Sequence, residues 1–197
     1  MSALPAASRR DHPAAGRWVL KVIAGEHCVS SDPQAAISTL LGSCVAACIR
    51  DPLARVGGMN HFMLPSSASG TWGIASSSLR YGNFAMERLI NDILTRGGQR
   101  RRLEAKVFGG ARLLSDSSGI GERNAQFVRD YLAAEGIGIV ASDLLGTQGR
   151  RLIYLPVNGH AFVSPLARAT LRIAEAERRY SRTMPASMPA GSIELFE

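Results

Sequence analysis

Apolar positions recur along the chain at two spacings, one typical of helices and one of strands. Residues 83–96 carry an apolar stripe at helical spacing, with Asn83 placed as an N-cap and Gly97 and Gly98 at the end. Residues 121–135 repeat this spacing and end at Gly136. Pro165 is placed to begin a further helix that runs to about residue 180. The pattern therefore predicts three helices.

Short runs of apolar and β-branched residues predict the strands. They lie at residues 18–23, 36–41, 103–108, 137–142, 151–157 and 160–164. Asn158-Gly159 between the last two runs predicts a two-residue hairpin turn. Because helices and strands are mixed and at least two strand pairs are antiparallel, we expect an α+β, or layered α/β, fold. Its sheets should be mixed and largely antiparallel, with helices packed on them.

Residues 44–64 predict another hairpin, with the turn at Pro52-Leu53. A two-residue turn there places Cys44 directly opposite His61. Directly opposed residues in an antiparallel pair share a face, with Cβ atoms about 5 Å apart. The register thus predicts a thiol within reach of an imidazole, although a slip of one residue would send His61 to the other face.

A thiol beside an imidazole is the arrangement of nucleophilic cysteine catalysis, so we interpret Cys44 as nucleophile and His61 as base. Gly42 and Ser43 precede Cys44, and backbone N–H groups there could bind an oxyanion. Thr39 could orient the imidazole as the third member of a triad. The alternative is that Cys44 is an inert small hydrophobic residue and His61 is structural.

The other two cysteines suit catalysis less well. Cys48 lies opposite Gly57 in this register and is interpreted as a core residue. Cys28 follows His27 directly, and adjacent strand residues point to opposite faces. A zinc site is not expected, because no second pair of ligands with suitable spacing follows Cys44 and Cys48.

Composition sets the organisation and the class of partner. With 197 residues we expect a disordered leader (1–16), a single domain (17–181) and a flexible tail (182–197). No apolar window of about 18 residues predicts membrane insertion, and no secretory signal is evident, so a cytoplasmic location is expected. Three cysteines fit a reducing compartment. The net charge of +7 comes largely from arginine clusters that contain no aromatic residue, which argues against nucleic acid as a partner.

Several ordered motifs resemble the chemoreceptor glutamine deamidase family, CheD. They are Thr39-Leu-Leu-Gly-Ser-Cys44, Gly57-Gly-Met-Asn-His61 through Pro65, Tyr81-Gly-Asn83-Phe-Ala-Met, Ala105-Lys-Val-Phe-Gly-Gly110, Ile120-Gly-Glu-Arg-Asn124 and Gly149-Arg-Arg-Leu-Ile-Tyr154. The resemblance covers roughly residues 18–163. It implies a catalytic triad of Cys44, His61 and Thr39, with Ser38 as the neighbour that could replace Thr39.

The resemblance also implies an activity and its partners. Family members deamidate specific glutamines on the cytoplasmic helices of chemotaxis receptors, without metal or organic cofactor, and some bind a CheC-type phosphatase. Their fold is a layered α/β fold related to the deamidase domain of cytotoxic necrotizing factor toxins. We expect a protein-glutamine glutaminase that works through a Cys44 thioester in a shallow cleft that Tyr81 and Asn83 could line. Two alternatives stay open: a thiol protease or acyltransferase, and a non-enzymatic chemotaxis regulator.

Overall fold

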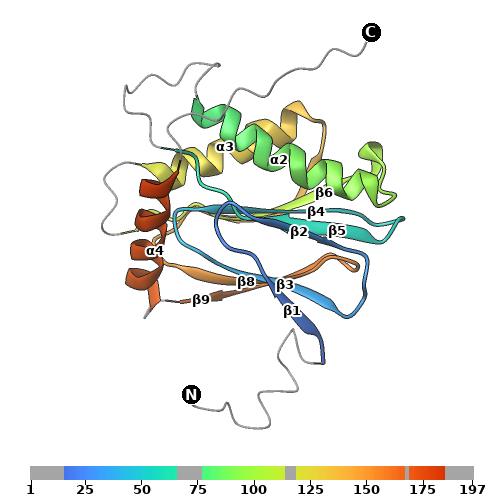
Figure 1. Cartoon of the computed structure of the whole chain (residues 1–197), viewed down its shortest axis with the longest axis horizontal. Helices are drawn as coiled ribbons and strands as arrows, with labels where there is room; N and C mark the ends of the chain where they lie inside the picture. The colour runs from blue at the N-terminus through green and yellow to red at the C-terminus, as the bar shows by residue number, and fades with distance from the viewer. Residues whose placement is uncertain (1–15, 66–76, 114–118, 167–168, 185–197) are drawn as a thin grey trace.

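The computed structural model describes residues 16–65, 77–113, 119–166 and 169–184, and these form three layers with a helix across one end (Figure 1). Helices lie above a five-stranded sheet, and a four-stranded sheet lies beneath it. The expected leader at 1–16 and tail at 182–197 fall almost wholly outside the described residues. Their proposed character therefore stays a prediction.

The five-stranded sheet is the middle layer, in the order β2-β5-β4-β6-β7. Neighbouring strands are antiparallel except for β6 and β7, which are parallel. The strands are β2 (His27–Ser30), β4 (Val45–Asp51), β5 (Val56–Asn60), β6 (Glu104–Gly109) and β7 (Gly138–Leu144). Strand β2 was not predicted, because it is a short edge strand with polar residues at both ends.

The four-stranded sheet has the order β1-β3-β8-β9, with β1 parallel to β3 and the other pairs antiparallel. Its strands are β1 (Trp18–Lys21), β3 (Ala35–Leu41), β8 (Arg150–Leu155) and β9 (His160–Pro165). Two mixed, mostly antiparallel sheets with packed helices confirm the expected fold class.

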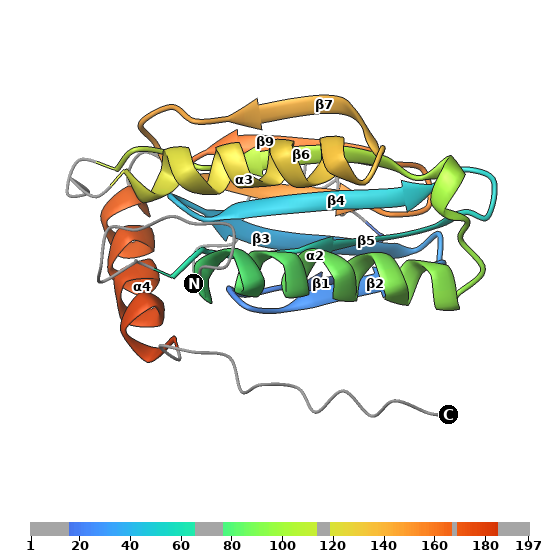
Figure 2. The same cartoon turned by 90° about the horizontal axis from the view of Figure 1, so that it is seen from above.

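Helices α2 (Ser77–Thr95) and α3 (Ile120–Ala134) run side by side over the outer face of the five-stranded sheet (Figure 2). The core between them and the sheet includes four residues of the predicted stripe, Met86, Leu89, Ile90 and Ile93, and the fifth, Leu94, packs against it partly buried. Strand β4 contributes Val45, Ala47 and Ile49 to this layer, since alternate residues of a strand share a face.

The opposite face of β4 lies in the core between the two sheets. Cys44, Ala46 and Cys48 are buried there with Met59 of β5, beside residues of the other sheet such as Ile37 and Leu152. Any chemistry at Cys44 must therefore take place between the two sheets, at the N-terminal end of β4. The last helix, α4 (Thr170–Thr183), lies across that end of the sheets (Figures 1 and 2).

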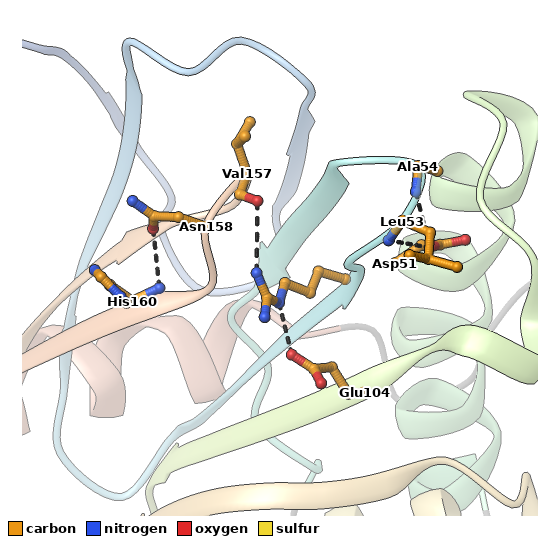
Figure 3. Close-up of polar contacts among 8 residues, drawn as sticks. Asp51, Leu53, Ala54, Glu104, Val157, Asn158 and His160 are labelled. Atoms are coloured by element: carbon orange, nitrogen blue, oxygen red, sulfur yellow. Dashed lines mark hydrogen bonds and ion pairs between the residues drawn. The ribbon is translucent and has the colours of Figure 1, made fainter.

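Both predicted hairpins have longer turns than expected. Asp51 pairs with Val56, so four residues rather than two connect β4 to β5, and the register differs from the predicted one by two residues. The Asp51 carboxylate accepts hydrogen bonds from the N–H groups of Leu53 and Ala54, at 2.9 and 3.0 Å, and this stabilises the wider turn (Figure 3). Arg55 completes it with a φ of 55°, in the left-handed region.

The second hairpin shows the same difference. Leu155 pairs with His160, so the turn contains four residues and not the Asn158-Gly159 pair alone. The Asn158 side chain accepts a hydrogen bond from the N–H of His160 (Figure 3). In both hairpins the shift is an even number of residues, so every side chain keeps its predicted face.

Two predicted helix starts were wrong. Asn83 is not an N-cap but an exposed residue inside α2, which begins at Ser77. The helix passes through Gly82, where a Cβ would lie 2.5 Å from the ring of Phe127, so the glycine serves close packing. Pro165 ends β9 instead of opening a helix. Because β9 is an edge strand, the N–H that proline lacks is not needed there.

Candidate active site

Thr39, Cys44 and His61 come together at one end of the layer between the sheets. Thr39 belongs to β3 of the four-stranded sheet, Cys44 directly precedes β4, and His61 directly follows β5 of the five-stranded sheet. All three residues are buried. Cys44 does not lie opposite His61 as predicted, because Val45 pairs with Phe62. The two residues are diagonal neighbours on the same face.

The hydroxyl of Thr39 determines which nitrogen of His61 carries the proton. It donates a hydrogen bond to the backbone oxygen of Val22 at 2.6 Å, and it lies 2.8 Å from Nδ1 of His61. Since its one proton is used towards Val22, the hydroxyl oxygen accepts from Nδ1–H. Nε2 of His61 is then the unprotonated nitrogen, with a lone pair that can take up a proton.

Nε2 of His61 is buried and has no hydrogen-bond partner among the described residues. A ring nitrogen of His61 and Sγ of Cys44 lie within 4.8 Å of one another. Buried polar atoms are rarely left unpaired, and a catalytic role is one reason for an exception. The arrangement leaves a basic nitrogen close to a thiol.

Ser38 does not take the place of Thr39. Its hydroxyl donates to the backbone oxygen of Leu152 in the neighbouring strand β8, at 3.1 Å. Adjacent residues of a strand point to opposite faces, so Ser38 faces away from the layer that holds His61. The structure therefore brings Thr39, and not Ser38, to the imidazole.

The loop between β3 and β4 directs three consecutive N–H groups, those of Gly42, Ser43 and Cys44, to one point. We call these three groups the N–H cradle. Their partner is the carboxylate of Glu177 in α4, whose Oε1 accepts from Gly42 and Cys44 at 2.9 and 3.1 Å. Oε2 accepts from the N–H and the hydroxyl of Ser43 at 2.8 and 2.7 Å. The cradle binds an anion next to the thiol.

The backbone carbonyl groups of the same loop also accept hydrogen bonds. Asn124 of α3 donates to the backbone oxygen of Ser43 and accepts from the N–H of Leu64, both at 2.8 Å. The backbone N–H groups of Gly110 and Ala111 donate to the oxygens of Cys44 and Gly42. These bonds fix the peptide planes and so aim the N–H groups of the cradle.

Sequence reasoning missed Glu177 and Asn124. Asn124 lies in one of the family-like motifs, Ile120-Gly-Glu-Arg-Asn124, which is a signal that could have identified it. Glu177 lies 135 residues from Gly42 in a charged helix, where no local pattern distinguishes it from its exposed neighbour Glu175. Only the packing of α4 brings it to the cradle.

The thiol and the imidazole are both neutral in this arrangement. Burial raises the pKa of the Cys44 thiol well above its usual value, and the charge of Glu177 and a hydrogen bond to it raise that pKa further. Burial lowers the pKa of His61 to about 4, and the nearby Glu177 carboxylate opposes this only in part. The docked carboxylate thus disfavours the thiolate that would act as nucleophile.

The remaining candidate residues have other surroundings. Cys48 is buried opposite Met59, and burial also raises the pKa of its thiol. Tyr81 forms a hydrogen bond with the hydroxyl of Tyr180 in α4, so it contacts the helix that covers the site. The glycine pair at 57–58 is packed closely against its neighbours. At Gly58, a Cβ would lie 2.4 Å from the backbone oxygen of Cys28.

The spacing of Cys44, His61 and Glu177 would also admit a metal ion, since one donor atom from each lies within 4.8 Å of the others. Both carboxylate oxygens of Glu177, however, already face N–H and O–H groups, whose positive ends repel a cation. The donor set therefore fits a nucleophile, a base and an anion site better than a metal centre. None of the helices that the structure describes is long and apolar enough to cross a membrane.

The family model and the sequence relatives agree on one family. A family model described as CheD chemotactic sensory transduction matches residues 63–165. A Rhodopseudomonas palustris protein named "Probable chemoreceptor glutamine deamidase CheD" is 54% identical over 178 residues, 90% of this chain and 84% of the relative. A protein of the same name from Hahella chejuensis is 41% identical over 183 residues, 92% of this chain and 86% of the relative. A solved structure from Neisseria meningitidis has a TM-score of 0.44 at 10% identity over 71% of this chain and 76% of its own, which is too distant to support an argument.

Proposed function

The chain belongs to the CheD family, and on this premise we propose that it hydrolyses the side-chain amide of specific glutamines on chemotaxis receptors. The products are a glutamate side chain and ammonia, which makes the protein a protein-glutamine glutaminase. The relatives that are 54% and 41% identical are named as chemoreceptor glutamine deamidases, and each aligns over most of this chain.

One observation carries the proposal: the Thr39 hydroxyl leaves Nε2 of His61 free, and the His61 ring lies in a buried cluster with the Cys44 thiol and an anion site. These are the parts that acyl transfer from an amide needs. They are a nucleophile, a base that can return its proton to the leaving group, and donors for the developing oxyanion.

The reaction begins when Nε2 of His61 takes the proton of the Cys44 thiol. The thiolate attacks the carboxamide carbon of the substrate glutamine, and the N–H cradle holds the negative oxygen of the tetrahedral intermediate. Nε2–H then protonates the amide nitrogen, the C–N bond breaks and ammonia leaves. The acyl group remains on Cys44 as a thioester.

Hydrolysis of the thioester reverses these roles. Nε2 of His61 removes a proton from a water molecule, and the hydroxide attacks the thioester carbon. The C–S bond breaks, the carboxylic acid forms and releases its proton to solvent to become glutamate, and the proton on Nε2 returns to the sulfur. Thr39 acts throughout as a positioning residue, because its hydroxyl keeps the proton of the neutral ring on Nδ1.

The expected partners follow from this reaction. The substrates are cytoplasmic domains of chemotaxis receptors, so the enzyme is expected in the cytoplasm. A CheC-type phosphatase as a further partner stays a prediction from the resemblance. A thiol protease or acyltransferase, or a binding protein with an unused site, would share part of this geometry, and the experiment must separate these cases.

The test is mass spectrometry of a purified receptor cytoplasmic domain after incubation with the enzyme, together with an ammonia assay. Wild type should raise the mass of particular glutamine-containing peptides by about 1 Da and release equal ammonia, because a thioester route replaces NH2 by OH. Cys44→Ala should do neither. Cys48→Ala is the matched control, since it removes a buried thiol of the same sheet face and should remain active.

Each alternative predicts a different result. Cleaved receptor chains without ammonia would identify a protease, and a transferred acyl group would identify an acyltransferase. Activity that survives Cys44→Ala would refute the nucleophile. If wild type and Glu177→Ala both bind the receptor and both leave its mass unchanged, the protein is a regulator.

A further inference from the structure

Helix α4 closes the site just described, and it does so along one face. Ile173, Ala174, Glu177 and Tyr180 follow the spacing of neighbours on a helix surface. Tyr180 forms a hydrogen bond with Tyr81 of α2, and its hydroxyl lies 2.4 Å from the position that a Cβ at Gly25 would take. Ala174 packs with Ala111 and Leu113. The helix reaches from the base of the cradle to the start of α2.

The group that α4 places in the cradle is chemically the product of the proposed reaction. Glutamine deamidation leaves a glutamate side chain with its carboxylate beside the nucleophile. Glu177 presents a glutamate carboxylate that accepts four hydrogen bonds at the cradle and lies within 4.8 Å of Sγ of Cys44. It is buried, and no salt bridge to a cation is formed by it among the described residues.

A carboxylate held only by neutral donors next to a catalytic thiol is an unusual structural feature. Burying a charge without a cationic partner costs stability unless a preformed anion site receives it. The fit of Glu177 to the N–H cradle therefore indicates that the cradle is shaped for a carboxamide or carboxylate that arrives on a helix.

Resting on the proposed function, we propose that α4 is a built-in product mimic: it occupies the surface on which a glutamine-bearing helix of the substrate docks, and it holds the enzyme closed until that helix replaces it. The partner defined by this chemistry is a helix with an exposed glutamine at the position equivalent to Glu177. The enzyme is thereby inhibited by its own chain.

The contacts of α4 indicate what the replacing helix must offer. Ile173, four residues before Glu177, lies against Gly42 and Gly149, where a Cβ at either glycine would be within 3.0 Å of the Ile173 side chain. Ala174, three residues before Glu177, sits in the small cluster with Ala111 and Leu113. A substrate helix should therefore carry an apolar residue four positions before the glutamine and a small residue three positions before it.

The docking of α4 is weak enough to be reversed. Among its 14 residues only Ile173, Ala174 and Glu177 are buried, and one of these three is charged. A helix that buries so little apolar surface gains little from packing. A second helix with a neutral glutamine avoids the burial of a charge and can compete for the same place.

The first experiment measures how well α4 covers Cys44, and it needs no receptor. Cys44 is fully buried, so its alkylation by iodoacetamide, followed by peptide mass mapping, reports how often α4 leaves. Glu177→Ala should raise the alkylation rate of Cys44 at least about tenfold, because loss of the carboxylate raises both the fraction of molecules with α4 open and the thiolate fraction of Cys44. Glu175→Ala is the matched control: it removes the same charge two residues away at an exposed position, and its rate should equal that of wild type. Thermal unfolding of both variants checks the fold.

The second experiment tests product mimicry. In Glu177→Gln the helix carries a substrate amide at the cradle, and Cys44 should convert it to glutamate. The peptide that contains residue 177 should then gain about 1 Da on incubation, as a thioester route predicts. The double variant Glu177→Gln, Cys44→Ala should keep the amide, which excludes spontaneous deamidation. The glutamine variant preserves the shape of the side chain and serves also if Glu177→Ala does not fold.

The outcomes separate this proposal from the proposed function. The product mimic is refuted if Cys44 is alkylated at the same rate in Glu177→Ala and Glu175→Ala and if the Glu177→Gln variant keeps its amide. If wild type still deamidates receptors in that case, the proposed deamidase function stands. If the amide of Glu177→Gln becomes a carboxylate but no receptor peptide gains mass, the product mimic stands and the receptor is the wrong substrate. Faster deamidation of receptors by Glu177→Ala than by Glu175→Ala supports both.

Discussion

The orientation of His61 by Thr39 gives the sharpest test of the catalytic geometry. The perturbation is Thr39→Val, which keeps the branched shape of the side chain and removes only the hydroxyl. In the native site that hydroxyl donates to the oxygen of Val22 at 2.6 Å and accepts from Nδ1 of His61 at 2.8 Å. The variant leaves a buried Nδ1–H without its acceptor.

The magnitude follows from the cost of that unpaired group. A buried donor without a partner costs about 1–3 kcal/mol, and the ring can avoid the cost by moving its proton to Nε2. With the proton on Nε2, His61 cannot act as the base. A shift of about 1.4 kcal/mol corresponds to a factor of about ten, so kcat should fall roughly tenfold to a hundredfold. KM should change little, because the Thr39 hydroxyl is buried between the Val22 oxygen and the His61 ring.

The assay is steady-state ammonia release from a receptor domain, combined with 15N NMR of the His61 ring. Thr39→Ser is the control, since it keeps the hydroxyl and should retain both most of kcat and the Nδ1–H tautomer. A merely structural role would lower thermal stability in both variants without moving the tautomer. If Thr39→Val keeps the wild-type kcat with an intact fold, the orienting role is wrong.

Three further predictions concern the backbone at Gly109, the turn closed by Asp51 and the protonation of His61. Gly109→Ala should abolish activity and lower the thermal unfolding temperature. The reason is that φ is +106° at this position and a Cβ would lie 2.2 Å from the backbone oxygen of Cys44. A soluble, active variant would contradict this prediction. Asp51→Asn should lower the free energy of unfolding, measured in urea at neutral pH, by about 3 kcal/mol. Burial alone would raise the pKa of the Asp51 carboxyl, but hydrogen bonds from Arg102 and from three backbone N–H groups hold that pKa well below its usual range. That stability is present above the carboxyl's unfolded-state pKa and is lost as the pH falls below it, so the gap between wild type and Asp51→Asn should narrow in acid. The pKa of His61 is about 4 in the folded state and about 6.5 in the unfolded state, so protonation favours unfolding as the pH falls. Between about pH 7 and pH 5 the free energy of unfolding of wild type should therefore decrease by roughly 2 kcal/mol more than that of His61→Asn. Equal decreases would show that the ring is not buried in its neutral form.

Apart from β2, the strands and the two helices over the middle sheet were predictable because each depends on a local pattern. The apolar stripe predicted in residues 83–96 is the stripe that packs under α2. Alternation along β4 assigned Cys44 and Cys48 to one face, and that assignment survived a register error of two residues because the side-chain period is also two. Turn length was not predictable, since a single side chain, Asp51, closes the longer turn through hydrogen bonds to Leu53 and Ala54.

What the sequence by itself determined is the chemistry available: a cysteine after Gly42-Ser43, a histidine on the same strand face, and motifs that indicate the family. Only the tertiary structure decided which hydroxyl meets the imidazole, because Thr39 and His61 belong to different sheets and meet only when the two sheets pack. The same is true of Glu177, which reaches Gly42 across 135 residues of chain. Periodicity is a property of neighbouring residues, whereas these contacts depend on how whole layers are stacked.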